Sequence, residues 1–133
     1  MPRRHNDVLQ ERVVLDAEHV EVTADTTNKL WKLTRDLRVD AVRYINPTGL
    51  VADATHFFEL KLIQGASTVI ASWSTETGEE GTIAADTFVD FTMGAAADQV
   101  IPAGTVISLF LDEDAGATAT LPAGRIQIEG RYL

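Results

Sequence analysis

The segment RIQIEGRY, residues 125–132, alternates polar and apolar positions along its length. A period of two places Ile126, Ile128 and Tyr132 on one face of an extended chain, with the charged and amide side chains on the other. On a helix the same residues would be scattered around the circumference. The pattern therefore predicts a half-buried β-strand and favours an all-β protein.

The same alternation recurs along the chain and predicts further strands. Residues 105–111 (TVISLFL) are apolar on both faces, as expected of a central strand covered on both sides. Residues 37–45 are rich in β-branched side chains, and their alternation slips near Ala41-Val42, which predicts a β-bulge. The expected strands are 19–23, 30–34, 37–45, 58–62, 68–73, 88–93, 105–111 and 125–132.

Turn-forming residues separate these segments. Residues 46–49 (NPTG), 64–67 (QGAS) and 76–81 (ETGEEG) contain side chains that preset φ or tolerate positive φ. Pro-Ala-Gly precedes two strong strands, where proline is tolerated because it need not donate to the ladder. About eight or nine short strands at this spacing predict an antiparallel β-sandwich or barrel.

The first part of the chain differs from the rest, because glycine is absent before Gly49. We expect an extended N-terminal arm over residues 1–18, leading into a single β-sandwich domain over residues 19–133. A helix over residues 7–20 is the alternative, since several apolar residues there fall near i, i+4 spacing. The β-branched run Arg12-Val13-Val14-Leu15 and the lack of an amphipathic face favour the extended arm.

Charge limits the partners of this protein. The net charge is −9, from 20 acidic and 11 basic residues, so nucleic acid is not an expected partner. No run of about twenty apolar residues is present, so we expect neither a membrane span nor a membrane partner. Arg3, Arg4 and Arg12 lie near the start of this acidic chain. They either form a docking device for an acidic neighbour or act as solvated charges that maintain solubility.

Side chains for catalysis or metal binding are scarce. The chain has no cysteine, and His5, His19 and His56 are widely spaced without a metal-binding motif. No Gly-x-Ser-x-Gly elbow or phosphate-binding glycine loop is present. We therefore expect no enzyme activity, no cofactor and no metal. Trp31 lies in the glycine-free segment, where it either packs in the core or belongs to an interface.

Five segments together resemble the small jelly-roll decoration (cement) proteins of tailed-bacteriophage heads. The resemblance implies a jelly-roll β-sandwich on the outer surface of a virion, made in the host cytoplasm, with a terminal arm that reaches across the major capsid protein. It also implies a homo-oligomer, a trimer in preference to a dimer. The segments are RVDAVRYINPTGL (38–50), STVIASWST (67–75), TIAADTFVDFTM (82–93), VIPAGTVISLFLDE (100–113) and ATLPAGRIQIEGRYL (119–133).

The expected function is that of a capsid decoration protein, which stabilises the shell by bridging major capsid subunits. Charge and position alone make Arg3, Arg4, Arg12 and Trp31 the candidate capsid-contact residues. A carbohydrate- or receptor-binding β-sandwich, such as a tail-fibre or lectin-like module, is the alternative. Self-association is also expected from physics, since an isolated sandwich leaves edge strands that symmetric packing covers.

Overall fold

A computed structural model describes residues 11–113 and 120–133 of the chain. This part is all-β, with ten strands and one short 3-10 helix, η1 (Ala96–Gln99). No helix in the described residues has the length and apolar character needed to cross a membrane. The strands are β1 (Arg12–His19), β2 (Thr26–Lys32), β3 (Leu37–Ile45), β4 (Phe58–Gln64), β5 (Thr68–Ser74), β6 (Val89–Asp90), β7 (Thr92–Met93), β8 (Val100–Ile101), β9 (Val106–Glu113) and β10 (Gly124–Tyr132).

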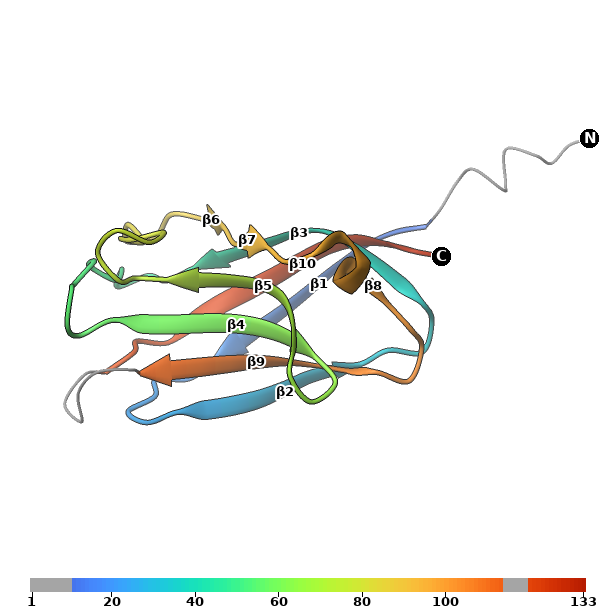
Figure 1. Ribbon diagram of the computed structural model, residues 1–133, viewed down its shortest axis with the longest axis horizontal. Helices are drawn as coiled ribbons and strands as arrows, with labels where there is room; N and C mark the ends of the chain where they lie inside the picture. Colours follow the sequence, from blue (N-terminus) through green and yellow to red (C-terminus); the bar gives the residue numbers. More distant parts are fainter. Residues whose placement is uncertain (1–10, 114–119) are drawn as a thin grey trace, which may run out of the picture.

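The strands form two antiparallel sheets stacked face to face (Figure 1). The back sheet has the order β1-β10-β3-β6, and β8 also pairs with β3. The front sheet has the order β2-β9-β4-β5-β7. The chain changes sheet after most strands, and the β4–β5 hairpin is an exception. This order is that of a jelly roll, so the predicted jelly-roll sandwich is confirmed.

The hydrophobic core lies between the two sheets. Its largest buried members come from central strands, as Leu60 on β4, Leu109 on β9 and Ile128 on β10 illustrate, each fully buried. The alternation that predicted β10 is confirmed, because Ile126 and Ile128 face this core while the residues between them face solvent or lie part-buried. Burial of such side chains is the main stabilising term for a sandwich of this size.

The first strand begins earlier than the sequence suggested. Residues 12–18, expected in the arm, are part of β1, which pairs with β10 without a register shift from Arg12 to His19. The sandwich thus starts at Arg12 rather than at residue 19, and the helical alternative is wrong for this segment. The physical reason is that Val13, Leu15 and Ala17 pack against the core at every second position. Residues 1–10 of the expected arm lie outside the described residues.

Bulges interrupt β2, β3 and β5, and those on β3 and β5 bear on the predicted alternation. On β3, Ala41 and Val39 pair with consecutive residues of β10, so Asp40 is the extra residue and the predicted bulge is confirmed beside Ala41. A second bulge, on β5, was not expected. It leaves Ile70 without an opposite residue on β4, so that Ile70 and Ala71 are both buried instead of alternating. Strict period-two reasoning fails there because a bulge inserts one residue into the pattern.

Candidate functional site

Three arginines lie side by side at one end of the back sheet. Arg131 on β10 is directly opposite Arg12 on β1 and directly opposite Arg38 on β3. Their side chains point away from the core, since the neighbouring positions on β3 and β10 are buried. We call Arg12, Arg131 and Arg38 the arginine row.

Two members of the arginine row have acidic partners. The guanidinium of Arg12 lies 3.4 Å from a carboxylate oxygen of Glu129, and that of Arg131 lies 3.2 Å from Asp40. Arg38 is exposed and has no ion pair within the described part of the chain. The side chain of Arg12 is 68% exposed, so its pair with Glu129 leaves most of the guanidinium open to solvent. The row therefore presents net positive charge on an acidic protein.

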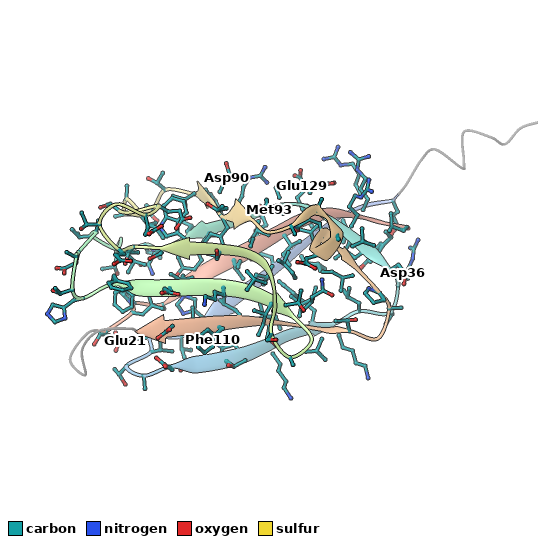
Figure 2. All side chains as sticks on the ribbon, in the orientation of Figure 1. Glu21, Asp36, Asp90, Met93, Phe110 and Glu129 are labelled. Atoms are coloured by element: carbon teal, nitrogen blue, oxygen red, sulfur yellow. The ribbon has the colours of Figure 1, made fainter. Side chains whose placement is uncertain are left out.

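On the remainder of the same face, the arginines are paired with carboxylates. Arg43 on β3 contacts Asp90 at 3.2 Å and Glu129 at 3.5 Å, which continues the ion-pair network from Arg12 across four strands. Figure 2 labels Asp90 and Glu129 near the upper margin of the molecule. At the far end of β10, the guanidinium of Arg125 contacts Asp16 at 3.4 Å and Glu18 at 2.6 Å. Exposed pairs of this kind contribute about 0–1 kcal/mol each, so the network orients side chains more than it stabilises the fold.

Like charges directly opposite each other on antiparallel strands are destabilising. Arg12, Arg131 and Arg38 keep this arrangement, whereas the rest of the face pairs opposite charges. Guanidinium groups match carboxylates with two parallel hydrogen bonds, which makes a row of them suited to an acidic partner. Within the described residues, Arg12 and Arg131 are paired with Glu129 and Asp40, which offsets part of the repulsion within the row.

Local contacts fix the chain ends beside this row. The guanidinium of Arg35 lies 4.5 Å from the centre of the Tyr132 ring and contacts a carboxylate oxygen of Glu11 at 3.0 Å. The backbone N–H of Tyr132 also donates to the carbonyl of Glu11 at 2.9 Å. The start of β1 and the end of β10 consequently lie at the same end of the molecule (Figure 1). Glu11, the first described residue, therefore lies at the same end of the sandwich as the arginine row.

A buried polar cluster lies at the opposite end of β1. His19 Nδ1 is 2.8 Å from the carbonyl of Val20, which can only accept, so Nδ1 carries the proton. His19 Nε2 then accepts a hydrogen bond from the Tyr44 hydroxyl at 2.6 Å, and that hydroxyl accepts one from Asn46 Nδ2 at 3.2 Å. Burial lowers the pKa of His19 below its ordinary value of 6.5 and raises the pKa of Tyr44 to about 12. Both groups are thus neutral near pH 7.

Asn46 links this cluster to the following turn. Its side-chain oxygen accepts hydrogen bonds from the backbone N–H groups of Thr48 and Gly49, and its amide donates to the carbonyl of Pro122. The cluster thus joins three separate chain segments. A hollow of about 430 Å³ lies beside it, and its lining includes the half-exposed ring of Phe88. The cluster satisfies its own hydrogen bonds, which identifies it as structural.

A second hollow, of about 500 Å³, lies on the outer face of the front sheet. Phe110 on β9 provides an aromatic surface there, and Figure 2 labels it. Ile63 on β4 and Val69 on β5 extend the apolar part, while Lys29 and Lys61 bring two ammonium groups. Lys61 is paired with Glu59 at 3.4 Å. The complete lining is Thr27, Lys29, Lys61, Ile63, Gly65, Ala66, Ser67, Val69, Ser108 and Phe110.

The expected contact residues do not form one cluster. Arg12 belongs to the arginine row, whereas Trp31 is on β2 of the other sheet, where it is partly buried against the hydrophobic core. Arg3 and Arg4 lie outside the described residues. Sequence reasoning missed Arg38 and Arg131, although the alternation on each strand marks both as outward-facing. Their proximity to Arg12 depends on the strand order and register, which no local pattern reveals.

The histidines do not form a metal site in the described residues. His19 is buried in the polar cluster, and His56 follows a turn in which Asp53 Oδ1 accepts hydrogen bonds from the backbone N–H groups of Thr55 and His56. His5 lies outside the described residues. Within residues 11–113 and 120–133, no three histidine, aspartate or glutamate side chains are grouped so as to hold a metal ion.

Comparison with known proteins yields one distant structural neighbour. No protein-family model and no curated protein matches this chain. Among solved structures, the chain is similar to a chain from "Structure of infectious bursal disease virus Gx strain", with 13% sequence identity and a TM-score of 0.28. The match covers 92% of this chain and 30% of that chain, so this protein spans less than a third of its neighbour's length. Similarity this low assigns neither family nor function.

Proposed function

We propose that this protein is a structural component of a virus particle, and that it decorates the outer surface of a phage head. The observation that carries the proposal is the arginine row, an outward-facing strip of positive charge on a protein of net charge −9. The jelly-roll order of the strands agrees with it, because this architecture recurs in viral capsid proteins. The role requires neither catalysis nor a cofactor.

The partner we propose is an acidic surface formed by major capsid subunits. Arg38 and Arg131 would bind its carboxylates through paired N–H donors, and Arg12 would extend the contact along β1. Glu11 lies beside this strip, and the expected arm before it, with Arg3 and Arg4, would contact a second subunit. Simultaneous contacts with two subunits raise the effective concentration of each, which slows dissociation and stabilises the assembled shell.

The test is co-sedimentation of the full-length protein with capsid shells from its source. Saturable binding at a fixed ratio to the capsid subunit is expected, with an affinity that falls as salt rises. The variant Arg38→Ala/Arg131→Ala should weaken binding by at least tenfold. Its matched control is Arg43→Ala/Arg125→Ala, which removes the same charge from the same face and strands but outside the row. Equal loss in both variants, or no binding of the wild type, would refute the proposal.

The hollow on the front sheet favours a second candidate function, the binding of an anionic glycan. An aromatic ring flanked by ammonium and hydroxyl groups suits a sugar ring that bears a carboxylate or sulfate. A glycan array probed with the wild type and with Phe110→Ala tests it. Signal confined to acidic glycans and lost in the variant supports this function, whereas an array without signal rejects it.

A further inference from the structure

The two long edge strands of the sandwich differ in how they are protected. On the front sheet, β2 has a register shift between Lys29 and Trp31 and bears exposed Lys29 and Lys32. Bulges and lysines are the usual means of preventing an edge from pairing with another chain. On the back sheet, β1 has eight residues, no register shift and no lysine, proline or glycine. The strands at the opposite edges, β6, β7 and β8, have two residues each.

The backbone groups available on β1 follow from its pairing with β10. The N–H of Tyr132 donates to the carbonyl of Glu11, which makes that opposite pair hydrogen-bonded. Hydrogen-bonded pairs recur at every second residue, so the odd-numbered residues of β1 direct their N–H and C=O groups toward β10. Residues 12, 14, 16 and 18 direct theirs toward the open edge, since β1 is the terminal strand of its sheet within residues 11–113 and 120–133.

We propose that this open edge binds the β1 strand of a second copy of the same chain. Two copies related by a two-fold axis, a dimer in place of the trimer that the resemblance implies, would pair antiparallel. Arg12 would lie opposite the partner's Glu18, and Val14 opposite the partner's Asp16. In this register residues 12, 14, 16 and 18 of each copy all pair across the interface, with about eight backbone hydrogen bonds in total. The inference is independent of capsid binding, because it concerns the isolated protein.

The number of paired backbone groups and the side-chain charges together favour this register over its neighbours. It places opposite charges across the interface twice, once for each Arg12 and Glu18 of the symmetric pair. A shift by two residues in one direction would set Asp16 against its own symmetry mate. A shift by two in the other would still oppose Arg12 and Asp16, but it would leave the open backbone groups of Glu18 without an opposite residue in the partner's β1. Val14, which is 57% exposed, would lie diagonally across from the other Val14 and lose part of its contact with water.

Sedimentation velocity of the full-length protein over a range of concentrations tests the proposal. The wild type should dimerise, and Val14→Pro should remain monomeric. The Val14 N–H points away from β10, so proline there removes no bond of the native sheet. Circular dichroism should confirm an unchanged fold for this variant. A wild type that stays monomeric at all concentrations, or a Val14→Pro variant that dimerises as the wild type does, overturns the inference.

Charge reversal tests the register itself. Arg12→Glu and Glu18→Arg should each weaken dimerisation roughly tenfold, because each sets like charges opposite one another twice. An equimolar mixture of the two variants should restore the wild-type affinity, since both glutamates at positions 12 and 18 of one copy then face arginines of the other. A mixture that associates no better than either variant alone rules out this register. Loss of capsid binding with dimerisation intact would refute only the proposed function.

Discussion

The hydroxyl group of Tyr44 gives the sharpest test of the structure, through the variant Tyr44→Phe. The residue is fully buried, and its hydroxyl donates to His19 Nε2 and accepts from Asn46 Nδ2. Phenylalanine fills the same space without that oxygen, so the substitution removes hydrogen bonds and leaves the packing in place. It also leaves His19 Nε2 as a buried acceptor without its donor.

The size of the effect follows from the groups left behind. A buried acceptor without a partner costs about 1–3 kcal/mol, whereas Asn46 Nδ2 keeps its bond to the carbonyl of Pro122 at 2.9 Å and loses less. We expect the free energy of unfolding to fall by about 2 kcal/mol. For a domain of this size that corresponds to a decrease in Tm of roughly 8 °C.

Urea denaturation followed by tryptophan fluorescence measures this loss, with an unchanged m-value as the sign that the unfolded state is unaffected. The control is Tyr132→Phe, the other tyrosine, whose ring faces Arg35 and whose hydroxyl makes no hydrogen bond within the described residues. It should change stability by less than about 0.5 kcal/mol. A Tyr44→Phe variant as stable as the wild type, or a control that loses as much, would refute the buried cluster.

Three further predictions concern the same fold. The free energy of unfolding should decline as pH falls from 7 through 6.5. Burial lowers the pKa of His19 in the folded protein, so the His19 side chain binds a proton more tightly in the unfolded chain. A His19→Gln variant should show a flatter dependence of stability on pH in the same titration. Gly49→Ala should lower the free energy of unfolding, measured in urea, by at least about 2 kcal/mol, since φ is +83° and the new Cβ would approach the Ala85 nitrogen to 2.9 Å. The control Gly78→Ala, also at positive φ but in open space, should lower it by only about 1 kcal/mol. Leu62→Ala should lower the free energy of unfolding by about 2–5 kcal/mol, because Leu62 is fully buried between the sheets, and a loss below 1 kcal/mol would contradict that placement.

The fold was predictable where local patterns matched local structure. The alternation at 125–132 predicted β10, and the apolar run at 105–111 predicted the central strand β9, because side-chain periodicity records which face is buried. The same reasoning did not identify β1. Burial alternates along this strand, but the exposed Val14 is apolar and interrupts the alternation of apolar and polar residues in the sequence. A β-branched run predicts an extended chain, but it does not predict whether that chain pairs with a sheet.

The candidate site was predictable only in part, because it depends on contacts between distant segments. Arg12 and Arg131 are 119 positions apart, yet β1 and β10 place them side by side. The bulge at Asp40 then sets the register that brings Arg38 opposite Arg131. Sequence patterns identify outward-facing positions, whereas cross-strand neighbours follow from topology and register. For Trp31 the sequence left open whether it packs in the core or belongs to an interface, and it packs against the core.

The two proposals reinforce each other geometrically. Pairing at the β1 edge would continue the back sheet across the two-fold axis, so both arginine rows would lie on one outward face. Because Arg12 lies opposite the partner's Glu18, the rows would be separated by about 20 Å along the strand direction. A rigid pair of anion-binding strips binds a repeating acidic lattice far more tightly than one strip does. The monomeric Val14→Pro variant should therefore occupy shells at the same ratio per chain but dissociate at least tenfold faster, whereas equal dissociation rates would mean that each copy binds alone.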